Sequence, residues 1–263
     1  AEPNLLVVRE VQVNPPEWSG PSLRVALVSD IHVGAPWSGL DRLHEIVEAT
    51  NATKPDLILL LGDFDINEIA GGEHVNEAGW TAVLAELSAP LGTYAVLGNH
   101  DWWNNEPEIR SQLEQHGIPV LENESVAMSH HGVPFYLAGI GDSITDHENI
   151  PASLKNIPAN AEILAMTHAP EVFDALDSRV DLLVAGHTHG GQVDLPILGT
   201  LAWTEPYVYG AYARDHQRLQ VTSGLGMSIY PIRFGVPPEI VVLSLQPALA
   251  TEPASLPSSN GRR

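Results

Sequence analysis

Two histidines lie in a glycine-rich stretch, Gly186-His-Thr-His-Gly-Gly191, directly after the apolar run 181–185. A short apolar run bounded by glycine is typical of a buried parallel strand, and glycine permits the backbone angles of a tight loop. Imidazole nitrogen is the commonest transition-metal ligand in proteins. The stretch therefore predicts a metal-binding loop or an ordinary polar loop with turn glycines, and taken alone it fits both equally.

Four further polar clusters follow apolar runs, where strands are expected to end: Asp30 with His32, then Asp63, then Asn99 with His100 and Asp101, and then His168. Asp30 and His32 are two residues apart, so in extended backbone both side chains could reach one ion. Asp63 could bridge two ions with its two oxygens, His100 could transfer a proton, and Asp101 could orient that imidazole. Each cluster by itself also fits a turn, a hydrogen-bonded loop or a buried histidine.

The elements between these clusters should place them on one edge of a sheet. Strands are expected at 5–13, 23–28, 56–61, 93–97, 161–167, 181–185 and 239–245, hairpins at 125–140 and 208–222, and helices at 40–51, 76–87 and 106–116. Ser38 is a possible N-cap of the first helix and Gly117 a C-terminal cap of the last. Repeated strand–loop–helix units predict a largely parallel sheet, whose carboxyl ends share one ligand-binding rim.

The rim would carry seven candidate ligands: four histidines, two aspartates and one asparagine. Two sites of about four ligands each result if one carboxylate is shared. A two-metal centre of this kind can hold a hydroxide between its ions and clamp a phosphoryl group. Together, the five clusters therefore favour a metal centre over five unrelated polar loops.

Composition limits the classes of partner and metal. The 263 residues suffice for one large α/β domain, and a net charge of -21 disfavours nucleic-acid backbones and anionic membranes as partners. The chain has no cysteine, so a metal must use nitrogen and oxygen ligands. No apolar run is long enough for a transmembrane segment and no signal peptide is recognised. We expect a soluble protein, with a trimmed leader left open.

Taken in order, five motifs resemble those of the calcineurin-like metallophosphoesterases: Ser29-Asp-Ile-His-Val-Gly34, Gly62-Asp63, Gly98-Asn-His-Asp101, Thr167-His168 and Gly186-His-Thr-His189. The resemblance spans residues 23 to 245. Finer motifs, such as Asn99-His-Asp-Trp-Trp103 and His189-Gly-Gly-Gln192, are similar to the bacterial phosphodiesterase branch that includes the YaeI and YkuE proteins.

The resemblance implies a fold and a ligand set. The fold is a four-layer α/β/β/α sandwich of two mixed sheets flanked by helices. From the pattern along the chain itself, we expect a single domain at 1–245 and, because residues 246–263 are rich in Pro, Ala and Ser, a flexible tail there. Two divalent ions (Mn, Fe, Zn, Co or Ni) are implied. The implied ligands are Asp30, His32 and His189 for the first ion, Asn99, His168 and His187 for the second, and Asp63 as the bridge. His100 would protonate the leaving group or stabilise the transition state, supported by Asp101.

The predicted function is a phosphodiesterase that uses a metal-bridging hydroxide as the nucleophile on a small-molecule phosphoester. A pyrophosphatase acting on a nucleotide-linked lipid or sugar, such as UDP-diacylglucosamine, is the alternative, and a non-catalytic binding scaffold with this fold is the third hypothesis. The resemblance to bacterial proteins indicates the bacterial cytoplasm, or an exported or membrane-associated location if a leader has been removed.

Several residues near the motifs leave their roles open. Trp102 and Trp103 either line the substrate site or fill the local core. Asp65, two residues beyond Asp63, is expected to be solvated, although it could face the rim. The remaining histidines, at 44, 74, 116, 130, 131, 147 and 216, are expected to be structural or solvated.

Overall fold

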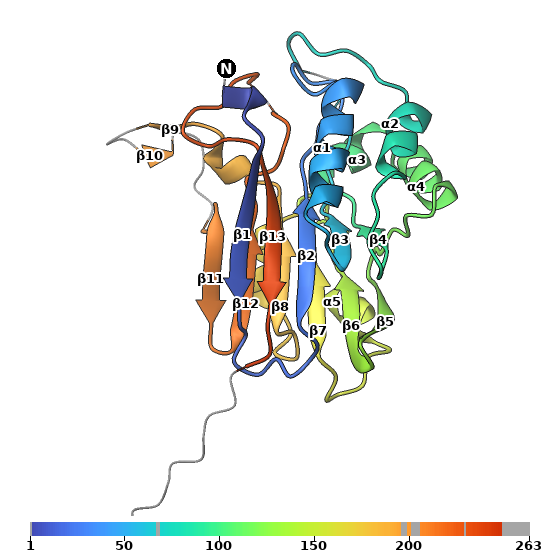
Figure 1. Ribbon diagram of the computed structural model, residues 1–263, viewed down its shortest axis with the longest axis vertical. Coiled ribbons are helices and arrows are strands. Elements are labelled where there is room, and N and C mark those ends of the chain that lie inside the picture. The colour runs from blue at the N-terminus through green and yellow to red at the C-terminus, as the bar shows by residue number, and fades with distance from the viewer. Residues whose placement is uncertain (1, 67–68, 196–198, 201–205, 229, 249–263) are drawn as a thin grey trace, which may run out of the picture.

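Two mixed β-sheets pack face to face in the structure, a computed structural model that describes residues 2–66, 69–195, 199–200, 206–228 and 230–248 (Figure 1). The first sheet holds, in spatial order, β1 (Val7–Val13), β13 (Glu239–Leu245), β2 (Leu23–Val28), β3 (Leu57–Leu60) and β4 (Thr93–Ala95). The second holds β11 (Gly210–Arg214), β12 (Gln217–Val221), β8 (Leu182–Ala185), β7 (Ile163–Met166), β6 (Val133–Gly139) and β5 (Glu124–His130). β9 (Asp194–Leu195) and β10 (Gly199–Thr200) form a separate short ribbon.

The central strands consist almost wholly of aliphatic residues because both faces of each sheet are covered. All four residues of β3, and all four of β8, are buried. Between the sheets, Leu27 and Leu59 of the first sheet belong to the same cluster as Leu164 and Val184 of the second. The parallel pairs β2–β3–β4 and β12–β8–β7–β6 direct their carboxyl ends to one rim.

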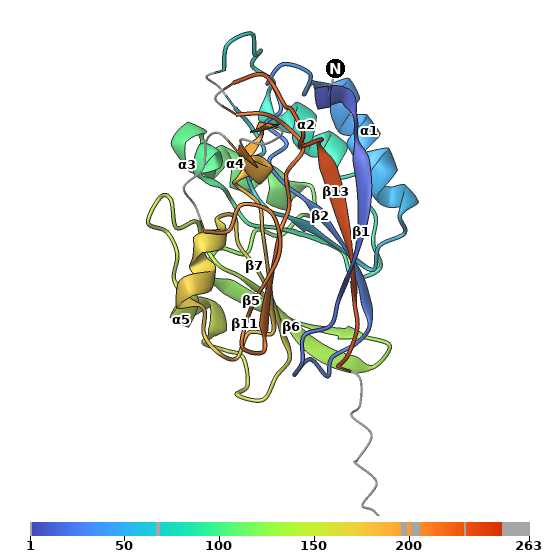
Figure 2. The same cartoon turned by 90° about the vertical axis from the view of Figure 1, so that its left-hand side faces the viewer.

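Helices cover the outer face of each sheet (Figure 2). α1 (Leu40–Ala52), α2 (Glu77–Leu84) and α4 (Glu106–Gln115) pack on the first sheet, whereas α5 (Ile150–Leu154) and the 3₁₀ helix η2 (Pro170–Ala175) pack on the second. The remaining short helices are α3 (Asn99–Asn104), η1 (Glu2–Asn4) and η3 (His189–Gly191). The expected fold, two mixed sheets flanked by helices, is therefore confirmed.

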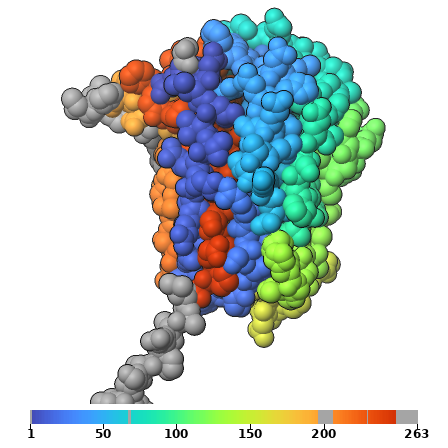
Figure 3. Space-filling view, viewed as in Figure 1, coloured from blue at the N-terminus to red at the C-terminus, as the bar shows by residue number. Residues whose placement is uncertain are grey.

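The two ends of the described chain meet in the first sheet. β1 and β13 pair in parallel along their whole length, and Figure 3 shows them side by side in blue and red. Within the segment predicted to be a flexible tail, the Gln246 amide donates to the Val13 carbonyl and the Ala248 amide donates to the Trp18 carbonyl. Residues 249–263 lie outside the described residues. Within the described residues, no helix has the length and apolar character to span a membrane.

Two local predictions about helix starts are wrong. α1 has Gly39 as its N-cap, and the Ser38 hydroxyl instead donates to the Ile31 carbonyl at 2.6 Å. The segment Gly98–Asp101, predicted to be a polar loop, is also helical except for Gly98, since α3 begins at Asn99. Gly117 does follow α4 with φ of +79°, a left-handed conformation that glycine adopts without steric cost.

The ring of Trp80 is fully buried and stacks on Phe64 with centroids 5.6 Å apart. Because Phe64 directly follows Asp63, this contact joins the core to the rim. We expect Trp80→Ala to lower the free energy of unfolding by about 3–5 kcal/mol, through lost contacts and a cavity. Chemical denaturation monitored by circular dichroism measures this. Trp103→Ala, at a tryptophan that is 62% exposed, is the matched control and should change stability by less than about 1 kcal/mol. Equal losses in the two variants would contradict the assignment of Trp80 to the core.

Candidate metal centre

Loops from both sheets bring the seven predicted ligands together at the rim. The potential ligand atoms form three groups, and within each group they all lie within 4.8 Å of one another. The groups are Asp30, His32 and His189; His32, Asp63 and His100; and Asp63, His168 and His187. The set is buried except for the partly exposed His187 and His100. Burying several carboxylates together removes their hydration and brings like charges close to one another. A bound cation would offset both costs.

The backbone holds most of these residues in the left-handed region, with φ between +48° and +69° for Asp30, His32, Asp63, His187 and His189. This region is uncommon for residues other than glycine, and such strain gathers at functional sites. The expectation that Asp30 and His32 converge because their backbone is extended is therefore wrong. Their side chains converge through two left-handed turns instead.

Backbone hydrogen bonds fix the loops to one another. The amide of Asp30 donates to the Gly62 carbonyl and the amide of His32 to the Asp63 carbonyl, which joins the loops after β2 and β3. Gly186 is required by close approach, because a Cβ there would collide with the Ser29 hydroxyl and the Asp30 carboxylate. The His187 amide in turn lies 3.1 Å from both carboxylate oxygens of Asp30. The glycine thus brings the second histidine loop onto the first aspartate.

The first group consists of Asp30, His32 and His189. The Nε2 atoms of the two histidines are 3.1 Å apart, and His189 Nε2 is 3.6 Å from Asp30 Oδ1. Burial lowers the pKa of His32 to about 3 and holds that of His189 well below its ordinary value. Both rings are therefore neutral at pH 7 and can offer a lone pair to a metal.

The second group surrounds His168. Its Nε2 is 3.2 Å from Asn99 Oδ1, 3.2 Å from His187 Nδ1 and 3.3 Å from Asp63 Oδ2. Its Nδ1 faces the Leu61 carbonyl at 2.7 Å. Burial opposes charge on this ring, but the Asp63 carboxylate outweighs it and holds the pKa of His168 well above its ordinary value. Burial lowers the pKa of His187 to about 3, which keeps the His187 ring neutral at pH 7.

Asp63 lies between the two groups and contacts both with one oxygen. Its Oδ2 is 3.6 Å from His32 Nε2 and 3.3 Å from His168 Nε2, whereas Oδ1 accepts a hydrogen bond from the His100 amide at 2.9 Å. Oδ2 therefore faces both groups, and the predicted bridging of two ions by Asp63 stays a prediction. Burial opposes charge on Asp63, but the adjacent imidazoles outweigh it and hold the pKa well below the ordinary range.

These observations fit two divalent ions. Each group combines imidazole nitrogen with carboxylate or amide oxygen, the ligand types that Mn, Fe, Co, Ni and Zn accept. A buried carboxylate oxygen between the groups could be shared by both ions. Burial raises the pKa of Asp30 to about 6 because the carboxylate is fully desolvated.

Asp101 has a different task from the one expected. Its carboxylate accepts hydrogen bonds from the backbone amides of Asp63 (2.8 Å), Gly98 (2.8 Å) and Phe64 (2.9 Å). It therefore fixes the loop that carries Asp63, rather than orienting the His100 imidazole. The His100 ring lies at the edge of the site, with its centroid 4.9 Å from that of His32 and 5.2 Å from that of Trp103.

The two tryptophans after His100 differ in environment. Trp102 packs against the core and stacks on His147 with centroids 3.5 Å apart. Trp103 is 62% exposed beside His100, so its indole is available to a ligand. The prediction that Asp65 is solvated is wrong, because this residue is buried and its backbone bridges to Val33; burial raises its pKa to about 6.

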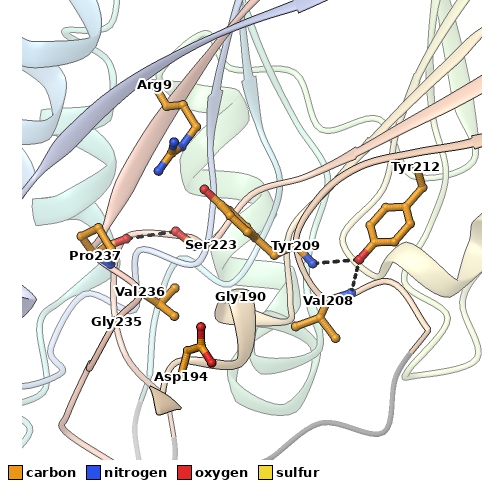
Figure 4. Close-up of a pocket in the computed structure, with 10 residues that line it drawn as sticks. All are labelled: Arg9, Gly190, Asp194, Val208, Tyr209, Tyr212, Ser223, Gly235, Val236 and Pro237. Carbon is orange, nitrogen blue, oxygen red and sulfur yellow. Dashed lines mark hydrogen bonds between the residues drawn. The ribbon is translucent and has the colours of Figure 1, made fainter. Parts of the chain in front are cut away.

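Arg233 is a residue of the site to which the sequence assigned no role. Its guanidinium is buried and lies 3.2 Å from His189 Nδ1. On the outer side of the same loop, Gly190 lines a pocket of about 360 Å³ together with Arg9, Tyr209 and Val236 (Figure 4).

Comparisons agree with this geometry. Residues 23–191 match the calcineurin-like phosphoesterase family. The chain is 30% identical over 230 residues to the uncharacterized metallophosphoesterase YkuE of Bacillus subtilis, covering 85% of this chain and 79% of that protein. It is also 30% identical over 230 residues to the phosphodiesterase YaeI of Escherichia coli, covering 84% and 82%. The NAD nucleotidase NadN of Haemophilus influenzae shares the fold, with a TM-score of 0.52 and 15% identity over 79% of this chain and 51% of NadN.

Removing the Asp101 carboxylate should disturb both the fold and the metal groups. Asp101→Ala leaves three buried amides without an acceptor, so we expect the free energy of unfolding to fall by about 3 kcal/mol or more and metal content to fall with it. Denaturation and elemental analysis measure the two effects. Asp41→Ala, at an exposed aspartate in the first turn of α1, serves as the control. A variant that keeps its stability and metal but loses activity would restore the expected role beside His100.

Proposed function

Since the chain belongs to the calcineurin-like phosphoesterase family, we propose that its rim binds two divalent ions and hydrolyses small-molecule phosphodiesters. The observation that carries the two-ion proposal is the position of Asp63 Oδ2. This oxygen lies 3.6 Å from His32 Nε2 in the first group and 3.3 Å from His168 Nε2 in the second. The relative YaeI, named a phosphodiesterase, supports the choice of diesters.

Residues of the chain would divide the work between binding and proton control. Asp30, His32 and His189 would hold one ion, Asn99, His168 and His187 the other, and Asp63 both. The bound ions supply Lewis-acid stabilisation of phosphoryl oxygens and make a water more acidic. His168 would keep its Nε2 toward the ions through the contact of Nδ1 with the Leu61 carbonyl.

His100 would act on the substrate rather than on the ions. Its backbone amide is fixed by Asp63 Oδ1, which places the imidazole at the partly exposed edge of the site. Burial lowers the pKa of His100, so the ring is neutral at pH 7. A neutral imidazole can donate its N–H to a phosphoryl or leaving-group oxygen and stabilise the charge that develops there.

Trp103 favours substrates with a planar group on one side of the phosphorus. Its exposed indole lies beside His100, where a leaving group would depart. An aromatic ring at this place can stack on an aryl group or a base. The same contact would suit the second candidate function, a pyrophosphatase acting on a nucleotide-linked substrate. A non-catalytic scaffold is disfavoured because no predicted ligand is missing from the rim.

The reaction and the two roles can be tested together. We expect hydrolysis of bis-p-nitrophenyl phosphate in the presence of Mn²⁺. Asp63→Asn should lose both metal and turnover, since one ligand serves both ions. His100→Ala should retain two ions per chain while kcat falls about 10²-fold or more. Elemental analysis and steady-state kinetics give both quantities. Metal loss in His100→Ala would contradict its assignment to the substrate, and a folded, metal-loaded protein without turnover would overturn the enzymatic proposal.

If the Trp103 indole stacks on the substrate, removing the indole should raise KM. For an aryl diester, we expect Trp103→Ala to raise KM about 5- to 10-fold with little change in kcat, because a stacking contact of about 1 kcal/mol is lost from the bound substrate. Trp103→Phe is the matched control and should recover most of the affinity. The same comparison on a diester with two small alkyl groups should give no difference. Equal effects on aryl and alkyl substrates would rule out stacking as the role of Trp103.

A further inference from the structure

The loop after β6, residues 141–149, is held in one path by its backbone. The Asn123 amide nitrogen donates to the His147 carbonyl at 2.8 Å. The side-chain oxygen of Asn123 accepts from the amides of Gly141 at 3.0 Å and Asn149 at 2.7 Å. Gly141 is required by close approach, because a Cβ there would lie 2.4 Å from the His147 carbonyl oxygen. These contacts fix the loop without any help from the His147 imidazole.

The ring of His147 is oriented as well, although the residue is exposed. Its Nδ1 lies 2.9 Å from the Thr145 hydroxyl, and that hydroxyl donates to Asp142 Oδ2 at 2.7 Å. Asp142 is fully buried and also accepts from the Thr145 amide at 3.0 Å. Exposed side chains normally keep their rotamer freedom, and ordering one costs entropy. A surface histidine that is oriented from a buried carboxylate therefore calls for a contact that its ring serves.

That contact is with Trp102 in α3. The two rings are nearly parallel, with 8° between their planes, and their centroids are 3.5 Å apart. Trp102 also packs against the core cluster of the first sheet. His147 belongs to the loop after β6 of the second sheet, whereas Trp102 follows β4 of the first. The stack therefore attaches α3 to the second sheet.

The C-terminal half of α3 depends on such an attachment. The first turn is held by Asp101, whose carboxylate accepts three backbone amides. Beyond that turn, the side-chain nitrogen of Asn104 lies 3.4 Å from the Asp65 carbonyl, at the limit of hydrogen-bond range. A helix of six residues has little stability of its own. Packing of Trp102 therefore decides where the second half of the helix lies.

Trp103 is the next residue of that half. Its indole is 62% exposed beside His100, so it has few contacts that could fix it independently. Successive residues of a helix point about 100° apart and turn together with the helix. A movement that freed Trp102 from His147 would therefore redirect the Trp103 indole as well.

We propose that His147 is a positioning residue that acts through Trp102 to hold the Trp103 indole at the edge of the metal centre. It would thereby set the affinity for substrates with a planar group, an inference that rests on the proposed stacking of substrate on Trp103. In this role His147 contributes the flat surface of its ring and transfers no proton. A phenyl ring should replace it, whereas a branched aliphatic side chain should not.

The kinetic test compares KM and kcat for bis-p-nitrophenyl phosphate in the presence of Mn²⁺. We expect His147→Leu to raise KM about threefold with kcat and metal content unchanged, because part of the stacking contact is lost. His147→Phe should keep the wild-type KM. On a diester with two small alkyl groups, both variants should match wild type. His44→Leu, at an exposed histidine of α1, is the matched control and should change neither constant.

A double-mutant cycle and a spectroscopic measurement test the route through Trp103. In a Trp103→Ala background, His147→Leu should have no further effect on KM, since the indole that it positions is gone. Fluorine NMR of protein labelled with 5-fluorotryptophan follows the indole without substrate, and Trp103→Phe identifies the Trp103 signal. In His147→Leu this signal should move toward that of a freely rotating indole, and in His147→Phe it should return.

The outcomes separate the two proposals. In a His147→Leu protein that circular dichroism shows to be folded, an unchanged KM together with an unchanged Trp103 signal would overturn the inference. Equal KM increases in His147→Leu and His147→Phe would overturn it too, because the imidazole would then act on the substrate itself. So would equal increases for aryl and alkyl diesters. If Trp103→Ala leaves the aryl KM unchanged while the Trp103 signal still responds to His147, the positioning is confirmed and the proposed stacking fails instead.

Discussion

The geometry of the rim depends on one buried carboxylate, that of Asp63. Its Oδ2 faces a histidine from each sheet, and its Oδ1 holds the amide of His100. Asp63 can do this because Asp101 binds the amides of Asp63, Phe64 and Gly98, which fixes the turn in a strained left-handed conformation. A single hydrogen-bonded unit thus links both metal groups and the proposed substrate histidine.

The two-sheet sandwich explains why ligands so far apart in sequence converge. Asp30 and Asp63 follow neighbouring strands of the first sheet, and His168 and His187 follow neighbouring strands of the second. The aliphatic layer between the sheets holds the two sets of strand ends at a fixed separation. Strain in the loops is tolerated because dense packing beneath them leaves no alternative backbone path.

Buried charge is arranged differently on the two sides of the centre. His168 has a carbonyl behind it, whereas His189 has a guanidinium. The chain has a net charge of -21, and the buried guanidinium of Arg233 places a positive charge next to His189.

The sequence alone determined which residues gather at the rim, because polar clusters at the ends of apolar strands share one edge in any parallel sheet. It also determined the family, since five short motifs recur in order. Only the tertiary structure decided how those residues are used. Asp101 turns to amides 37 and 38 residues away, Asp65 is buried against the loop of Val33, and Arg233 reaches His189 across 44 residues. Such contacts depend on packing between distant segments, which no local pattern of residue types encodes.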